Sequence, residues 1–249
     1  MNEFKVRLLG YTDNPQSLSV AGALSCFEEK SSNVVLNELN AMSPEARRKK
    51  EKGVLKNSFG RGHGAVGDQN YFIFSIENLP RVATLFLCAP EHLSHLQQSL
   101  RRATASRGFY LSEQIKKSDP HRTVERSLSN AFELYEKMKE AGIPGEDARF
   151  ILPLYTKTNI QTGGNARELC HLWSMAQEPG VPSIVKEVVE EMINQAREVA
   201  PYLFEDFGFN YEKIAWRPAP FLFAQENKGM KKIAEEAGHK KVVLISSDT

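Results

Sequence analysis

Alternating hydrophobic and polar positions predict β-strands in two parts of the chain. Between residues 3 and 10, Phe4, Val6 and Leu8 alternate with other residues, which is the period of a strand with one buried face. Residues 70–77 read NYFIFSIE and form the strongest strand candidate, because aromatic and β-branched side chains pack well on a pleated surface. Both segments are therefore expected in a sheet.

Apolar residues at helical spacing predict more helix than strand. In residues 119–141, Val124, Leu128 and Tyr135 recur on one face of a helix that Gly142 closes. Asn165 has the side chain of an N-cap for another helix. Further helices are expected where capping residues or prolines border suitable stretches, over residues 18–27, 43–58, 80–87, 91–102, 183–199 and 226–237. Many helices, few strands and no regular βαβ alternation indicate an α+β fold, with residues 242–245 as a final strand.

The composition is that of a globular protein and argues against several classes of partner. The chain has 249 residues, of which 41% are hydrophobic and 25% charged, and its formal net charge is +1. Because this balance gives no overall basic field, we expect neither nucleic acid nor anionic lipid as a partner. No apolar run approaches the roughly 20 residues that span a bilayer, and residues 1–11 lack the apolar core of a signal peptide. We therefore expect a cytoplasmic protein without a membrane partner.

The chain has three cysteines, Cys26, Cys88 and Cys170. Their odd number and wide separation favour buried apolar thiols over a disulfide framework. On one unbroken helix, Cys88, His92 and His95 would share a face and could bind zinc. Pro90 lies among them and should interrupt that helix, so we expect no metal site.

Residues 60–67 are rich in glycine and contain His63. A dinucleotide-binding loop should follow a strand and open a helix, whereas here a predicted helix precedes the glycines and a predicted strand follows them. The segment is therefore either a flexible connector or a place where a planar ligand approaches His63 closely, because the neighbouring glycines have no side chains.

Residues 94–107 combine hydroxyl groups with guanidinium groups. The members that could bind phosphate are Ser94, Ser99, Arg101, Arg102, Ser106 and Arg107. The guanidinium fork matches phosphate oxygens and keeps its charge; the alternative is a solvated basic helix end. Arg149 is a further candidate because it is the one charge in the apolar run of residues 148–153. Such a residue is either paired with a carboxylate or functional.

Four short motifs resemble, in the same order, those of the flavin-dependent thymidylate synthases. That family carries the signature R-H-R-x-x-S-x-N-x-x-S-x-R, and residues 89–101 (APEHLSHLQQSLR) share its two serines and its last arginine. Gly62 and His63 stand at the family's distance before an F-x-F strand. Residues 148–153 (ARFILP) and 165–169 (NAREL) resemble two downstream motifs.

The resemblance runs from about residue 5 to about residue 207. We therefore expect a family-like domain over residues 1–210 and a C-terminal extension over residues 211–249. The resemblance implies a homotetramer, an antiparallel sheet with several helices, and active sites built by several subunits. Members of the family methylate dUMP to dTMP, with methylenetetrahydrofolate as the carbon donor and NADPH-reduced FAD as the source of hydride.

The resemblance also implies roles for individual residues. Ser99 and Arg101 would hold the phosphate of dUMP, and Arg149 would reach the same nucleotide from a neighbouring subunit. The residues that would contact the flavin are His63, Ser94, Asn165, Arg167 and His171. No catalytic residue is assigned, because the family uses no cysteine nucleophile.

The chain departs from the signature where the family holds the flavin phosphates. Ala89, Pro90 and Glu91 stand in place of Arg-His-Arg, so Glu91 reverses a charge. FAD in the family's pose should bind more weakly unless Arg102 or Arg107 substitutes. Two hypotheses follow: a divergent flavin-dependent thymidylate synthase, and a non-catalytic paralogue that binds nucleotide or completes the sites of a competent sister subunit. A third is a related fold that uses another nucleotide or flavin for different chemistry.

Overall fold

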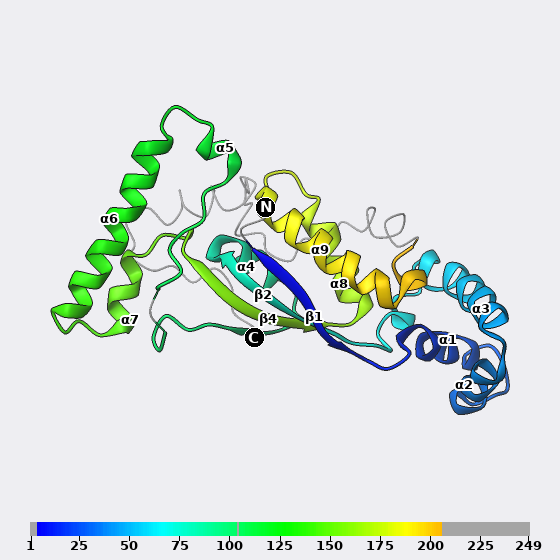
Figure 1. The fold of residues 1–249 in the computed structure, drawn as a ribbon. Helices are drawn as coiled ribbons and strands as arrows, with labels where there is room; N and C mark the ends of the chain where they lie inside the picture. The colour runs from blue at the N-terminus through cyan, green and yellow to red at the C-terminus, as the bar shows by residue number, and fades with distance from the viewer. Residues whose placement is uncertain (1–3, 104, 206–249) are drawn as a thin grey trace, which may run out of the picture. The chain divides into compact units, whose positions relative to one another are not determined.

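The computed structural model describes residues 4–103 and 105–205, which form an α+β fold (Figure 1). Its centre is a four-stranded antiparallel sheet in the order β1-β2-β4-β3. The strands are β1 (Lys5–Tyr11), β2 (Phe72–Pro80), β3 (Ser94–Gln97) and β4 (Lys157–Gly164). The predicted fold class is confirmed. The predicted boundary after residue 210 and the C-terminal extension, with a helix at 226–237 and a strand at 242–245, lie outside the described residues.

Helices cover one face of this sheet (Figure 1). Helices α4 (Arg81–Leu87) and α9 (Ser183–Val199) contact the strands, and α8 (Ala166–Ala176) packs against α9. Every second residue along β2, namely Phe72, Phe74 and Ile76, is fully buried in the core that these helices share. Burying such a side chain stabilises the fold by about 1.5–3 kcal/mol, so the alternating pattern fixes which face of β2 points inward.

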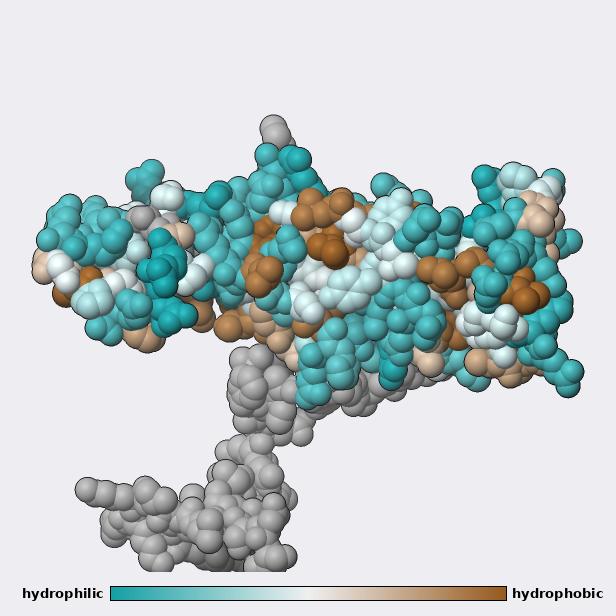
Figure 2. Space-filling model, turned by 90° about the horizontal axis from the view of Figure 1, so that it is seen from below, coloured by the Kyte–Doolittle hydropathy of each residue, from teal (hydrophilic) through white to brown (hydrophobic). Residues whose placement is uncertain are grey.

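The opposite face of the sheet is partly open and partly apolar. A cross-strand row on this face contains Arg7, Ser75, Gln161 and Leu96, and the side chain of Leu96 is 75% exposed. Seen from below the orientation of Figure 1, hydrophobic residues gather near the middle of the surface (Figure 2). This face is therefore available for contact with another protein surface.

Three helices follow β1. They are α1 (Pro15–Ser25), α2 (Ser32–Ala41) and α3 (Pro44–Asn57). Ser43 caps α3 as predicted, because its side chain accepts a hydrogen bond from the backbone N–H of Ala46 at 3.3 Å. The predicted helices at 18–27 and 43–58 correspond to α1 and α3, whereas α2 was not predicted.

The predicted amphipathic helix at 119–141 is present as α6 (His121–Glu140). Shorter turns flank it: α5 (Glu113–Lys116), α7 (Gly145–Ala148) and the 3-10 turn η3 (Arg149–Ile151). Tyr135 of α6 and Ala148 of α7 form a second, smaller core with Ala105, and Leu100 packs against it. This core holds the residues that follow β3 against α6 and α7.

The predicted helix over residues 91–102 is wrong. Residues 94–97 form strand β3 at the edge of the sheet, where Ser94 lies opposite Gly163 and Gln97 opposite Ile160 of β4. Pairing with β4 gives the backbone groups of this segment hydrogen-bond partners that the local sequence does not reveal. Consequently Ser99 and Arg101 lie in a turn after a strand rather than on one helix. In the described ranges no helix is long and apolar enough to cross a membrane.

Candidate functional site

The junction between β4 and α8 is built by hydrogen bonds from residues distant in the sequence. Asn165 caps α8 as predicted, and its Oδ1 accepts from the backbone N–H of Glu168 at 2.9 Å. The next residue, Ala166, donates its N–H to Oδ1 of the buried Asn70 at 2.9 Å. Asn70 in turn donates to Oγ of Ser19 on α1 at 3.0 Å. The start of α8 is therefore fixed to β2 and α1.

His63 and Arg167 belong to this same junction. His63 lies between the 3-10 turns η1 (Phe59–Arg61) and η2 (Gly64–Val66). A Cβ added to Gly64 would lie 3.0 Å from Nε of Arg167, so only a residue without a side chain lets the turn approach so closely. Nη1 of Arg167 forms an ion pair with Asp68 at 3.1 Å, just after η2. The structure thus brings together three residues that the resemblance assigned to the flavin: His63, Asn165 and Arg167.

His171 lies one turn further along α8 and faces a buried carboxylate. Its Nδ1 is 3.4 Å from Oε1 of Glu168, whose side chain is 5% exposed. Burial raises the pKa of Glu168, but the hydrogen bond and charge of His171, with the charges of His92 and Arg167, outweigh burial and leave that pKa lowered. Glu168 is therefore held as a carboxylate among cationic neighbours.

Ser94, the fifth residue assigned to the flavin, lies beside this junction. It is exposed at the start of β3, in register with Gly163. The preceding side chain, Leu93, occupies the space that a Cβ on Gly164 would need. All five predicted flavin residues therefore surround the end of β4. We name this group the junction site: His63, Ser94, Asn165, Arg167 and His171.

The other end of β3 carries the residues predicted to hold phosphate. Oγ of Ser99 accepts from the backbone N–H of Arg101 at 3.2 Å, and the carbonyl of Ser99 accepts from the N–H groups of Arg102 and Ala103. The hydroxyl hydrogen of Ser99 can still donate to a ligand. Ser99 is half-buried and Arg101 is exposed, so the turn presents one hydroxyl and one guanidinium to a ligand.

Arg149 lies near this turn within the same chain. It begins η3, and its Nε donates to the carbonyl of Glu146 at 3.1 Å. A Cβ on Gly145 would lie 3.4 Å from the carbonyl oxygen of Arg101, so α7 packs closely on the turn. Its charge also acts on Arg81 of α4 and, together with burial, lowers the pKa of Arg81. That Arg149 serves a neighbouring subunit stays a prediction.

The three arginines near Ser99 have no acidic partner among the described residues. None of the ion pairs formed within ranges 4–103 and 105–205 involves Arg81, Arg101 or Arg149. Of the two explanations given for Arg149, pairing with a carboxylate is therefore not found here. A group of like charges without counter-charges attracts an anion, and we name these residues with Ser99 the arginine site.

The residues considered for metal binding do not form a common face. Helix α4 ends at Leu87, before Cys88, and His95 lies on β3, where its Nδ1 is 2.7 Å from Oγ1 of Thr162. Burial lowers the pKa of His95, and its Nε2 is buried without a hydrogen-bond partner among the described residues. Within those residues no group of three or more His, Cys, Asp or Glu side chains could hold a metal ion.

The prediction of buried thiols holds for one of the three cysteines. Cys170 is fully buried in the main core, whereas Cys26 and Cys88 are exposed. Both exposed thiols lie just after a helix end, Cys26 after α1 and Cys88 after α4. All three are free thiols.

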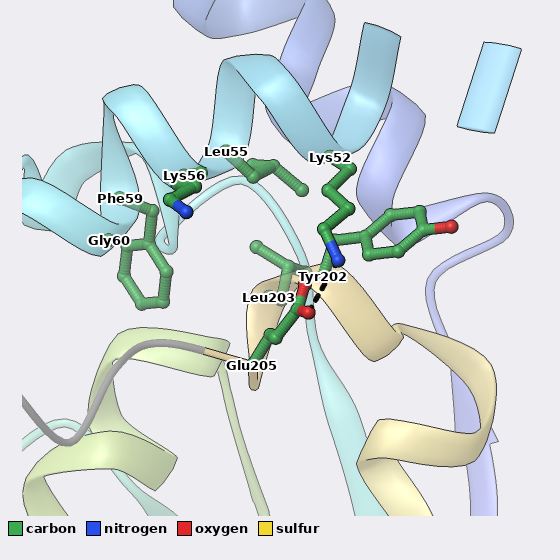
Figure 3. Close-up of a pocket in the computed structure, with 8 residues that line it drawn as sticks. All are labelled: Lys52, Leu55, Lys56, Phe59, Gly60, Tyr202, Leu203 and Glu205. Atoms are coloured by element: carbon green, nitrogen blue, oxygen red, sulfur yellow. Dashed lines mark hydrogen bonds and ion pairs between the residues drawn. The ribbon is translucent and has the colours of Figure 1, made fainter. Parts of the chain in front are cut away.

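Two hollows in the surface lie away from the junction site and the arginine site. Figure 3 shows a small one between α3 and the 3-10 turn η4 (Pro201–Leu203), across which Lys52 forms an ion pair with Glu205 at 2.6 Å. Its volume of about 10 Å³ suffices for one water molecule. A wider groove of about 360 Å³ lies between α1 and α3 and contains Phe27 and Lys49. Neither hollow is lined by a residue of the junction or arginine site.

Four residues that shape these sites were not predicted. They are Asp68, Asn70, Arg81 and Glu168. Arg81 carries the signal that singled out Arg149, since it is one charge between Pro80 and an apolar run. Glu168 sits in the NAREL motif, but its contact with His171 depends on helical spacing of three residues. Asp68 and Asn70 carry no sequence signal, because their partners lie about a hundred residues away.

The described chain is an α+β protein with a cationic turn at one end of an edge strand and a glycine- and histidine-rich junction at the other. Residues 7–202 match the family described as thymidylate synthase complementing protein, and the chain belongs to this family.

Relatives of the chain include flavin-dependent thymidylate synthases. The protein of that name from Geobacter sulfurreducens is 28% identical over 208 residues, which cover 82% of this chain and 87% of the relative. Its namesake from Saccharolobus solfataricus is 29% identical over 158 residues, covering 63% of this chain and 61% of the relative.

A crystal structure of the UMP/dUMP methylase PolB from Streptomyces cacaoi bound with 5-Br dUMP has a similar fold. The TM-score is 0.71 at 19% identity, and the match covers 84% of this chain and 96% of that chain. This similarity supports the fold described here.

Proposed function

We propose that the chain binds dUMP or a closely related pyrimidine nucleotide and catalyses its reductive methylation to dTMP. The observation that carries the proposal is the arginine site, where Ser99, Arg101 and Arg149 lie near one turn and the two arginines form no ion pair with a carboxylate of the described residues. Guanidinium groups bind phosphate through two parallel charge-assisted hydrogen bonds. The reaction would use methylenetetrahydrofolate as the carbon donor and NADPH as the reductant.

Strand β3 relates the two sites in space. Ser99 lies five positions after Ser94, which corresponds to about 16 Å of extended chain. A nucleotide whose phosphate lies at the arginine site would direct its base along β3 toward the junction site. In our proposal Ser99 and Arg101 hold the phosphate and Arg149 adds charge, from the same or a neighbouring subunit.

The junction site supplies polar groups that could contact the ring system of a flavin. They belong to His63, Ser94, Asn165, Arg167 and His171, whereas the spaces beside Gly64, Gly163 and Gly164 are filled by the side chains of Arg167, Tyr71 and Leu93. FAD would supply the hydride when bound. The residues that would hold the flavin phosphates fit less well, because Glu91 is exposed where the family has an arginine.

The open sites favour an assembly in which subunits complete one another. Ser94 of the junction site and Arg101 of the arginine site are exposed, and one face of the sheet exposes apolar residues such as Leu96. We therefore propose a homotetramer whose subunits share sites. We also propose that the protein acts in the cytoplasm. Binding of a catalytically competent paralogue in place of a second copy would use the same surfaces.

Binding measurements on the purified full chain test the proposed function. We expect dUMP to bind in calorimetry, FAD to bind with a change in its absorbance, and reduced flavin to be oxidised with dTMP formed when dUMP and methylenetetrahydrofolate are present. UMP is measured beside dUMP to define the nucleotide. If neither nucleotide binds at millimolar concentration, the proposal is wrong.

The replacement of Arg-His-Arg by Ala89, Pro90 and Glu91 supports a second candidate function. A chain that binds dUMP but no flavin would be a non-catalytic paralogue that binds nucleotide or completes the sites of a competent sister subunit. Nucleotide binding without any flavin uptake, with or without dUMP, would favour this candidate and exclude the first.

Replacing Glu91 by arginine tests whether its charge limits flavin binding. The variant removes a repulsion from the flavin phosphates and adds an attraction, each worth up to about 1 kcal/mol at an exposed position. We therefore expect Glu91→Arg to bind FAD about tenfold more tightly, measured by absorbance titration. Glu133→Arg on α6 makes the same charge change elsewhere and should leave the affinity unchanged. Equal FAD affinity in Glu91→Arg and the wild type would show that Ala89 and Pro90 matter more.

A further inference from the structure

Arg81 occupies a fixed position between β2 and the arginine site. It is the first residue of α4, and its backbone N–H donates to the carbonyl of Thr156 at 3.0 Å. The next N–H, of Val82, donates to the carbonyl of Leu154 at 2.9 Å. These bonds anchor the start of α4 to the segment that leads into β4, so the side chain of Arg81 projects from a rigid support.

That side chain holds the backbone immediately before Ser99. Nη2 of Arg81 donates to the carbonyl of Gln98 at 2.9 Å, and the N–H of Gln98 donates to the carbonyl of Asn159 at 2.9 Å. Both polar backbone groups of Gln98 are thereby bound. A rigid residue at 98 limits the positions open to the hydroxyl of Ser99.

A second link joins the same two elements. Nε2 of Gln97 donates to Oγ1 of Thr84 at 3.1 Å, and Oγ1 of Thr84 donates to the carbonyl of Arg81 at 2.9 Å. The first turn of α4 therefore contacts two successive residues at the end of β3. These two links fix the residues immediately before the turn at 99–103 to the start of α4.

The charge of Arg81 is not compensated within the described chain. Arg81 is half-buried and forms no ion pair there, and its Nε is buried without a hydrogen-bond partner in the described residues. A buried donor without an acceptor is costly, and so is a half-buried cation beside the like charge of Arg149. An anion at the arginine site would offset the second of these costs.

We propose that Arg81 is a positioning residue for the nucleotide phosphate, acting through the carbonyl of Gln98 on Ser99 and Arg101 and through its charge on the bound anion. The inference rests on the proposed function and adds a residue to it. Arg81 and Arg149 carry like charges near the same turn, so a dianionic phosphate bound there would gain affinity from both. A ligand without phosphate gains nothing from Arg81.

Comparing dUMP with deoxyuridine separates this role from a purely structural one. We expect Arg81→Met to weaken dUMP binding about ten- to a hundredfold, the range for a lost hydrogen bond to a charged group, and to leave deoxyuridine binding unchanged. Arg81→Lys keeps the charge but lacks the guanidinium fork, so its affinity for dUMP should lie between those of the wild type and Arg81→Met. Arg126→Met, at an exposed position on α6, controls for loss of one positive charge.

The outcomes of this experiment are distinct. Equal dUMP affinity in Arg81→Met and the wild type, or equal weakening of dUMP and deoxyuridine, overturns the inference while the proposed function stands. If the wild type binds no nucleotide, the proposed function falls, and inorganic phosphate then tests Arg81 alone. We expect phosphate to raise the melting temperature of the wild type and of Arg81→Lys. If Arg81→Met does not fold, Arg81→Lys takes its place in the comparison. Equal shifts in the wild type and every folded Arg81 variant would overturn the inference.

Discussion

A variant in which methionine replaces Arg101 is expected to bind dUMP about ten- to a hundredfold more weakly than the wild type. Arg101 is exposed in the turn after β3 and forms no ion pair in the described chain, so its guanidinium is available to a phosphate. Hydrogen bonds to a charged group contribute about 1.5–3 kcal/mol, which corresponds to this range of affinity. Isothermal titration calorimetry at fixed ionic strength measures the change.

Two comparisons make the result specific to the phosphate. Arg126→Met removes the same charge from the exposed surface of α6 and should change the dUMP dissociation constant less than about twofold, because isolated surface charges contribute little. The wild type should lose affinity as salt rises, and Arg101→Met should lose less. A dissociation constant that Arg101→Met leaves unaltered would mean that the turn faces solvent and binds no nucleotide.

Replacing Arg47 by methionine is expected to lower the free energy of unfolding by about 3–5 kcal/mol. Arg47 on α3 forms an ion pair at 3.0 Å with Glu51, whose side chain is 5% exposed. Ser17 on α1 also donates to the carboxylate of Glu51 and accepts from Arg47. Without Arg47 the buried carboxylate of Glu51 would keep only neutral donors, the hydroxyl of Ser17 and the amide of Gln16. Unfolding in urea, followed by circular dichroism, gives the change.

The neighbouring residue offers a matched control. Arg48→Met lies on the same helix at an exposed position and should change the free energy of unfolding by less than about 0.5 kcal/mol. The double variant Arg47→Met with Glu51→Leu should recover most of the stability, since removing both charges avoids the unpaired carboxylate. A loss below about 1 kcal/mol in the single variant would show that solvent reaches Glu51.

The sequence predicted those elements whose period is set by burial. In strand β2 the residues from Phe72 to Ile76 alternate between buried and half-buried because one face is covered, and α6 and α9 each place apolar residues on one side. Strand β4 was missed because its sequence, KTNIQTGG, has few apolar residues and ends in two glycines. It is a strand because β2 and β3 pair with it on both sides, and such long-range pairing leaves little local pattern.

The same reasoning explains which site residues were found. Ser99, Arg101 and Arg149 stood out as polar groups in or beside apolar sequence, and the resemblance supplied the five residues around the end of β4. The strand pairing of Ser94 with Gly163 places Ser94 beside the other four residues, which a helix at 91–102 would not have done. Asn70 and Asp68 could not be found, because their importance lies in contacts with Ala166 and Arg167.

Strand β3 has a consequence for ligand selection. Its four residues are held in register with β4, so the separation between the cationic turn and the glycine-rich corner is set by main-chain geometry. Exchanging side chains within β3 leaves that separation intact, whereas inserting or deleting one residue would change it. In the proposed function the strand thereby sets the distance between the phosphate of the nucleotide and the flavin.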